Sequence, residues 1–352
     1  MRFMKTFALL ELACLAMGCV GCGPSNNGGE AKRLTGGGST FIAPLFDEKW
    51  IGEYNEKGVQ IDYTGKGSGA GINDMIGNEA DFGCTDAAMS ADEIKRAGGE
   101  DAVVHIPLVM GAVVPVYNLN GVKDLNFTAE ILSGIYRNKI TNWGDPKIKE
   151  ANLEAKLPDE KINVVYRADG SGTSFIFTTY LTAADKDWAA GPGATKQVKV
   201  DGGQGLPGNG PLAEAVKSTK GAIGYVELLY ALKNPGLNIG KVKSRDGEFL
   251  TATLEGVTAA ADNALKTFSK EERDTLRYSI VNAPGKGAYP ISGTTWAVVK
   301  LKHPADKAKA LQAFLKWATH DGQASVTDLH YAAIPASIVE LADKKIDLIS
   351  AK

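Results

Sequence analysis

The residues with the clearest potential for binding chemistry form the run Arg167-Ala168-Asp169-Gly170-Ser171-Gly172-Thr173-Ser174. The apolar residues 162–166 before it are typical of a buried strand, and residues 175–181 after it are typical of a helix. The pattern predicts a strand that ends in a Gly/Ser/Thr turn at a helix start. The N–H groups of a helix start, hydroxyls and a guanidinium together suit a small tetrahedral oxyanion. For this segment alone, an ordinary capped helix beside a surface arginine is an equally good interpretation.

Three other loops place small polar residues next to predicted strands or helices. Thr40 and Phe41 follow a glycine run at one predicted helix start, and Ser68 lies between glycines at another. Asp86 comes just after a predicted strand. Each residue alone is most simply a helix cap or a turn residue. Because open α/β sheets bind ligands where strands lead into helices, the recurrence of these residue types favours a common site.

The elements that must position these residues alternate along the chain from about residue 33. Apolar residues between 42 and 54 recur at three- and four-residue spacing, which predicts a helix, whereas 59–63 alternates like a strand. Ser90-Ala91-Asp92-Glu93 predicts a helix cap. Short strands that alternate with helices indicate an α/β fold with a mainly parallel sheet.

Two segments indicate that the chain passes twice between two domains. Residues 103–116 contain two apolar runs around Gly111, and residues 282–290 are rich in Gly and Pro. We therefore predict that domain I comprises residues 33–110 plus 287–352 and that domain II comprises residues 111–286. The cleft between two such domains is a natural ligand site.

The N-terminus is typical of a targeting segment. A short basic region precedes a mostly apolar run that is too short to span a bilayer, although Glu11 interrupts it. We predict a lipoprotein-type signal peptide over residues 1–21 and a flexible tether over 22–32, with Cys19 and Cys22 as lipidation candidates. A plain secretory signal is the alternative. Either places the mature protein in the periplasm or at the cell surface, and a lipid would tether it to the membrane.

Composition and the remaining motifs narrow the function classes. The chain has 352 residues, is 44% hydrophobic and carries a net charge of -2, so nothing suggests a nucleic-acid partner. Residues 203–208 match the letters of a dinucleotide fingerprint, but Pro207 and residues 209–211 favour a loop. The four histidines lack metal-ligand spacing, so we expect neither a metal nor a cofactor. Cys84 lies beyond the leader in a strand pattern and is predicted to be buried, with no internal disulfide.

With these residues considered, the sequence resembles the periplasmic phosphate-binding proteins of bacterial Pst-type ABC importers over nearly all of the mature region. Residues 167–175 carry the most specific part of the resemblance. Supporting segments are residues 34–41, 65–71, 81–87, 221–227, 289–295 and 331–339. The resemblance implies an α/β, two-domain periplasmic-binding-protein (type II) fold with a hinge and an interdomain ligand cleft, and no catalytic residues.

The resemblance also implies a phosphate-binding role for eight residues. These are Thr40, Phe41, Ser68, Asp86, Arg167, Ser171, Gly172 and Thr173. The first three supply backbone or hydroxyl donors, Asp86 is the acceptor, and the last four clamp the opposite side. The family's second loop has paired serines, whereas Gly69 follows Ser68 here.

Asp86 bears on specificity because a carboxylate repels an anion that has no proton to donate. Phosphate carries such a proton near neutral pH, and sulfate does not, so Asp86 is expected to exclude sulfate. The sequence therefore predicts an extracytoplasmic, monomeric receptor that captures inorganic phosphate and delivers it to ABC permease subunits in the membrane. The alternatives are a secreted phosphatase or phosphoryl-transfer enzyme, and a receptor for another oxyanion such as molybdate or sulfate. The sequence shows no nucleophile-base pair or metal cluster, which argues against an enzyme.

Overall fold

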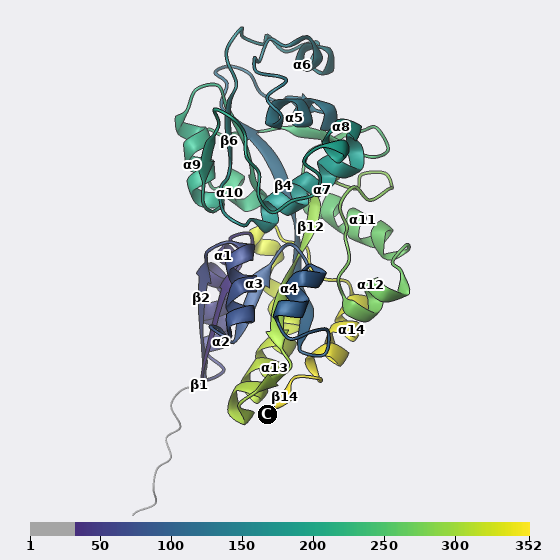
Figure 1. The fold of residues 1–352 in the computed structure, drawn as a ribbon. Coiled ribbons are helices and arrows are strands. Elements are labelled where there is room, and N and C mark those ends of the chain that lie inside the picture. The colour runs from purple at the N-terminus through teal and green to yellow at the C-terminus, as the bar shows by residue number, and fades with distance from the viewer. Residues whose placement is uncertain (1–31) are drawn as a thin grey trace, which may run out of the picture. The chain divides into compact units, whose positions relative to one another are not determined.

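A mixed nine-stranded sheet forms the frame of the computed structural model, which describes residues 32–352 (Figure 1). The predicted signal peptide, nearly all of the predicted tether, and Cys19 and Cys22 lie outside the described residues. The strand order of the sheet is β2-β1-β3-β12-β4-β8-β6-β7, and β9 pairs with β4. The strands are β1 (Lys32–Gly38), β2 (Val59–Gly65), β3 (Phe82–Thr85), β4 (Val103–Tyr117), β6 (Asn163–Arg167), β7 (Gln204–Leu206), β8 (Ala222–Glu227), β9 (Asn238–Ile239) and β12 (Ser292–Lys300).

Four pairs of neighbouring strands in this sheet are parallel and four are antiparallel, so the sheet is mixed, whereas the alternation of strands and helices predicts a mainly parallel one. β1 is parallel to both β2 and β3, and β6 is parallel to both β7 and β8. The central strands β4 and β12 run antiparallel to each other. The remaining strands form two small sheets, one with the order β11-β10-β5 and one of β13 and β14. Their bounds are β5 (Asn126–Phe127), β10 (Lys241–Lys243), β11 (Phe249–Leu250), β13 (Lys302–His303) and β14 (Ser350–Ala351).

Strand β4 joins the two halves of the sheet. All of its residues are buried, which fits its continuous apolar sequence. It pairs with β12 up to Ala112 and with β8 from Val113 onward. The change of partner lies beside Gly111, where a Cβ would come 2.7 Å from the Phe41 ring. The predicted crossing near Gly111 thus falls where β4 changes partner, and the division into two domains stays a prediction.

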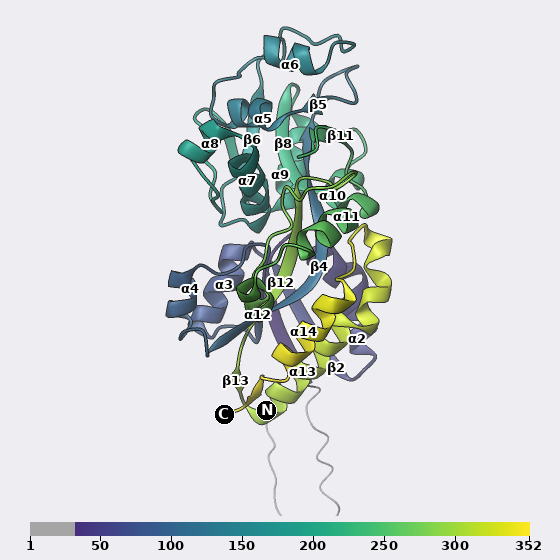
Figure 2. The same cartoon turned by 90° about the vertical axis from the view of Figure 1, so that its right-hand side faces the viewer.

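Helices cover the sheet, and Figure 2 shows α13 and α14 beside the half that contains β1, where both helices contact β4. The shorter helices are α1 (Ala43–Leu45), α2 (Ile51–Asn55), α4 (Ala91–Arg96), α6 (Pro146–Ala151), α8 (Lys186–Ala190), α10 (Leu228–Leu232) and α12 (Lys270–Thr275). The longer ones are α3 (Ser68–Gly77), α5 (Ala129–Tyr136), α7 (Gly172–Ala184), α9 (Asn209–Ser218), α11 (Leu254–Leu265), α13 (Ala305–Thr319) and α14 (Ala336–Ile346). A π-helical turn, η1 (Phe46–Trp50), joins α1 to α2, and two 3₁₀ turns, η2 (Asp321–Ser325) and η3 (Thr327–Leu329), follow α13. Among residues 32–352, no helix combines the length and apolar character that crossing a membrane requires.

Several local predictions are confirmed. The helical pattern of residues 42–54 becomes α1, η1 and α2 in succession, and Ser90 forms a capping box with Glu93. Cys84 is buried and free. His105 is also buried and accepts a hydrogen bond from the Met89 N–H at Nε2 (3.1 Å), and its burial lowers the histidine pKa to about 3.

Candidate anion-binding site

The predicted site residues come from four turns that follow strands. Thr40 and Phe41 follow β1, Ser68 begins α3 after β2, and Asp86 follows β3. The turn from β6 to α7 supplies the other four predicted residues, beginning with Arg167, the last residue of β6. Strand ends that lie side by side in one sheet bring such turns together.

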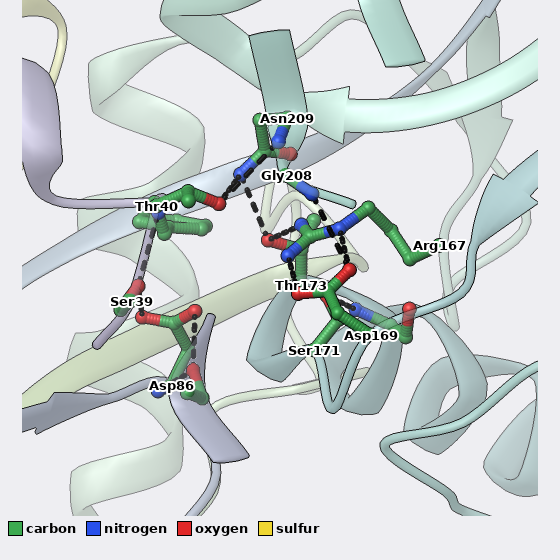
Figure 3. Close-up of polar contacts among 12 residues, drawn as sticks. Ser39, Thr40, Asp86, Arg167, Asp169, Ser171, Thr173, Gly208 and Asn209 are labelled. Carbon is green, nitrogen blue, oxygen red and sulfur yellow. Dashed lines mark hydrogen bonds and ion pairs between the residues drawn. The ribbon is translucent and has the colours of Figure 1, made fainter. Parts of the chain in front are cut away.

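Contacts among these turns show that they converge (Figure 3). A Cβ added to Gly172 would lie 2.3 Å from Ser68 Oγ and 2.5 Å from Asp86 Oδ2, so the start of α7 faces both residues. On the other side of the site, Thr40 and Thr173 are each hydrogen bonded to Asn209. The close approach at Gly172 leaves no room for a larger residue.

Asp86 is a buried carboxylate that accepts hydrogen bonds from hydroxyls. Ser39 Oγ and Thr295 Oγ1 donate to Oδ1 at 2.6 and 2.7 Å, and Ser68 Oγ donates to Oδ2 at 3.3 Å. Burial raises the pKa of Asp86 to about 6, while these hydroxyls and the positive charge of Arg167 oppose the shift. Ser39 and Thr295 were not among the residues predicted from the sequence, although Ser39 adjoins Thr40 and Thr295 lies in a segment of the family resemblance.

Arg167 is buried, with 1% of its side chain exposed, and forms a bidentate ion pair with Asp169. Its Nε donates to Asp169 Oδ1 at 2.7 Å and its Nη2 to Oδ2 at 2.6 Å. The pair leaves Nη1 turned to Thr173 Oγ1, at 3.4 Å. Asp169 therefore fixes the direction of the guanidinium. Asp169 was not among the predicted site residues, although its position two residues after Arg167 in the same turn was a usable signal.

The first turn of α7 supplies backbone donors. Ser171 caps the helix, because its Oγ accepts a hydrogen bond from Ser174 N at 3.0 Å. The N–H groups of Gly172 and Thr173 occupy the first two helical positions, where no intrahelical acceptor exists. Together with the positive end of the helix dipole, they suit an anion.

Two tyrosines hold the turn that carries Thr40 and Phe41. Tyr230 donates to the Thr40 carbonyl at 2.7 Å and Tyr331 donates to the Phe41 carbonyl at 2.6 Å. The Phe41 N–H, which the family resemblance assigns to the ligand, donates here to Ser39 Oγ at 3.0 Å. The two tyrosines thereby fix the orientation of the peptide groups in this turn.

The prediction of a loop for residues 203–211 is wrong. Strand β7 ends at Leu206 and α9 begins at Asn209, so only two residues separate them. Gly208 makes this short turn possible because it adopts a positive φ of 81°. Pro211 is tolerated because it lies in the first helical turn, where its missing N–H costs nothing. The structure thus places Asn209, a residue of the predicted loop, at the site.

Gly69 marks where the chain departs from the paired serines of the family pattern. Its N–H donates to the Gly170 carbonyl at 2.7 Å, and an added Cβ would lie 3.2 Å from Gly170 Cα. The backbones of the Ser68 and Arg167 turns are therefore in contact at this glycine.

The site as a whole offers many donors and two carboxylates, of which Asp169 is paired with Arg167 and Asp86 accepts from hydroxyls. Within residues 32–352, no group of three or more His, Cys, Asp and Glu side chains is placed to hold a metal ion. The donors suit an oxyanion, and the ionised carboxylate of Asp86 suits one that carries a proton.

Comparison with known proteins defines the class and then the family. The sequence model of the PBP superfamily domain matches residues 24–321. The phosphate-binding protein PstS of Xylella fastidiosa is 35% identical, with 95% of each chain covered, and that of Haemophilus influenzae is 34% identical over 88% of this chain and 91% of its own. A phosphate ABC transporter substrate-binding protein from Clostridium perfringens, solved with bound phosphate, has a TM-score of 0.62 at 22% identity and covers 86% of this chain and 100% of its own.

The chain therefore belongs to the PBP superfamily and, within it, to the family of PstS phosphate-binding proteins. The predicted α/β periplasmic-binding-protein fold is confirmed by the superfamily match and by the structural similarity.

Proposed function

We propose that this protein captures inorganic phosphate outside the cytoplasm and delivers it to an ABC-type importer. The observation that carries the proposal is the buried carboxylate of Asp86 at the centre of otherwise donor-rich turns. The names of the PstS relatives support the same ligand. The Clostridium perfringens protein, described as the substrate-binding protein of a phosphate ABC transporter, supports the transport system.

In this proposal the ligand is held from two sides. Arg167, with the turn that begins α7, donates hydrogen bonds to the unprotonated oxygens, and Thr40 donates from the opposite side. The Phe41 N–H and the Ser68 hydroxyl, which the family resemblance also assigns to the ligand, would donate to it in place of the hydrogen bonds that they make here to Ser39 and Asp86. Asp86 accepts a hydrogen bond from the phosphate hydroxyl. Bound in this way, phosphate exchanges its water shell for fixed donors, which a dry site must provide.

The proposed role is binding without catalysis, in agreement with the relatives, which are named as binding proteins. Calorimetric titration tests it. We expect phosphate to bind with one-to-one stoichiometry and sulfate not to compete, because sulfate has no proton for Asp86. Equal displacement of phosphate by sulfate would instead support a receptor for another oxyanion, and turnover of a chromogenic phosphate ester would support the enzyme.

We also propose that residues 33–110 plus 287–352 and residues 111–286 are two domains that close over phosphate. Contacts across the proposed boundary support closure: Lys196 pairs with Glu93, and Lys233 pairs with Glu48. Neither set of turns can surround a tetrahedral anion alone, so the ligand should favour the closed arrangement. We expect X-ray scattering to show a smaller radius of gyration with phosphate than with sulfate at equal ionic strength. Binding without any compaction would reject the hinge.

A lipid on Cys19 or Cys22 is proposed to keep the protein, as a monomer, near the permease subunits. A variant with both cysteines replaced by serine should leave the membrane fraction and appear in the soluble extracytoplasmic fraction. Membrane association that persists in this variant would reject the lipid and leave a plain exported protein.

A further inference from the structure

We infer that Asn209 is a positioning residue that makes the hydroxyls of Thr40 and Thr173 hydrogen-bond donors toward the bound anion. The inference rests on the proposed function and adds a residue to which neither the sequence pattern nor the family resemblance gave a role. Asn209 is fully buried at the start of α9, between the Thr40 turn and the first turn of α7 (Figure 3).

The orientation of the Asn209 amide is settled by the backbone of β8. Its Oδ1 accepts a hydrogen bond from the Glu227 N–H at 3.1 Å. A backbone N–H can only donate, so the amide oxygen must face Glu227 and the NH₂ group must face the site. Glu227 is the last residue of β8 and also caps α10, because its Oε2 accepts a hydrogen bond from Leu229 N at 3.0 Å. The strand and the helix cap together fix the Glu227 N–H that binds Asn209.

The NH₂ group reaches both threonines. Asn209 Nδ2 lies 3.0 Å from Thr40 Oγ1 and 3.1 Å from Thr173 Oγ1. Because Nδ2 can only donate, both hydroxyl oxygens must accept these bonds. One buried amide thus joins the two turns.

A second donor reaches each of the same oxygens. The Asn209 backbone N–H lies 3.4 Å from Thr40 Oγ1, and Arg167 Nη1 lies 3.4 Å from Thr173 Oγ1. A hydroxyl has two acceptor positions and one proton. With both acceptor positions occupied, the proton of each threonine is left to be donated to another acceptor, which is an oxygen of the anion in the proposed function.

This arrangement gives the site two sides of opposite character. Thr40 and Thr173 offer hydroxyl protons as hydrogen-bond donors, whereas Asp86 presents a carboxylate whose oxygens accept hydrogen bonds from the hydroxyls of Ser39, Thr295 and Ser68. A phosphate would therefore turn its hydroxyl to Asp86 and its unprotonated oxygens to the threonines. Asn209 acts on this orientation through the two hydroxyls and needs no contact with the ligand.

The sharpest test is Asn209→Asp, which keeps the shape of the side chain and exchanges a donor for an acceptor. At pH 8.5 the ionised carboxylate would draw both threonine protons to itself and repel the anion. We expect phosphate affinity to fall about a hundredfold relative to wild type at that pH. At pH 5.5 the loss should be several-fold smaller, because a protonated carboxyl can again donate.

Asn209→Ala separates this role from simple packing. It removes the donor without adding an acceptor, so we expect about a tenfold loss of phosphate affinity that is the same at pH 5.5 and pH 8.5. In a Thr40→Val background, where the hydroxyl is already absent, Asn209→Ala should reduce phosphate affinity by a clearly smaller factor than it does in wild type. Asn209→Ser, which restores one short donor, should recover part of the affinity.

Asn152 offers a matched control. It is also a buried asparagine with three bonds to backbone groups, since its Oδ1 accepts from Asn126 N at 2.7 Å and its Nδ2 donates to the carbonyls of Asn126 and Ile148 at 3.0 and 2.9 Å. Asn152→Ala and Asn152→Asp should leave phosphate affinity unchanged, even where they lower the melting temperature.

The outcomes separate this inference from the proposed function. If wild type fails to bind phosphate, the proposed function is wrong. If wild type binds and Asn209→Asp loses the same factor at both pH values, or loses nothing, Asn209 does not set the direction of the hydroxyls. Melting curves without phosphate establish that each variant is folded, and the near-isosteric Asn209→Asp carries the test if Asn209→Ala is not.

Discussion

Asp86→Asn is expected to weaken phosphate binding and to narrow the gap between phosphate and sulfate. The carboxylate can only accept, so it favours an anion that carries a proton, whereas an amide can also donate to a fully ionised oxyanion. A hydrogen bond to a charged group contributes about 1.5–3 kcal/mol, so we expect phosphate affinity to fall about ten- to a hundredfold. Sulfate affinity should rise. Paired calorimetric titrations with phosphate and sulfate measure both changes.

The ligand-free protein provides a second measurement on the same variant. Burial raises the pKa of Asp86 to about 6, above its ordinary value of 3.8, so the folded state keeps a proton that the unfolded chain has lost. This proton stabilises the folded state. Its contribution to the free energy of unfolding, about 3 kcal/mol, is complete below about pH 4 and is lost as the pH rises through about 6. In Asp86→Asn this fall in the free energy of unfolding should be absent from denaturant titrations at pH 4–7.

A suitable control is Asp81→Asn. Asp81 is a partly buried carboxylate that pairs with Lys307 at 2.7 Å and precedes β3, whereas Asp86 follows it. This change should leave the ratio of phosphate to sulfate affinity as it is in wild type. If Asp86→Asn also leaves the ratio of phosphate to sulfate affinity unchanged, Asp86 does not determine the specificity.

Arg167→Lys is expected to lose about ten- to a hundredfold in phosphate affinity although the charge is kept. The guanidinium binds Asp169 through two nitrogens and directs Nη1 to Thr173. A single ammonium cannot satisfy both directions from one position. Titration calorimetry measures the loss.

Arg277 provides the comparison for Arg167. It also forms a bidentate pair, with both Nη atoms 3.0 Å from the carboxylate of Glu100, but the Glu100 side chain is 63% exposed. Arg277→Lys should leave phosphate affinity unchanged. Wild-type affinity in Arg167→Lys would show that this arginine serves only to hold its own turn.

The sequence by itself was sufficient to predict the local elements that carry the site. The apolar run before Arg167, the cap at Ser171 and the helix after it are short-range features, because strand and helix periodicity and capping depend on neighbours a few residues away. The capping box of Ser90 and Glu93 is also a short-range feature that the sequence predicts. The alternation of these elements was enough for the α/β class, and the resemblance identified the turns that could share a ligand.

Only the tertiary structure decided which side chains from different turns contact one another at the site. Asp86 meets Thr295 across 209 residues of sequence, and Asn209 meets Thr40 across 169. No local pattern reports such contacts, because they depend on the order of strands in the sheet and on how close two backbones come. Residues 203–211 show the limit most clearly: their Gly and Pro content favours a loop, yet Gly208 at positive φ closes a two-residue turn that begins α9. Packing of α9 against β8 then buries Asn209, and burial obliges its amide to find partners on both sides of the site.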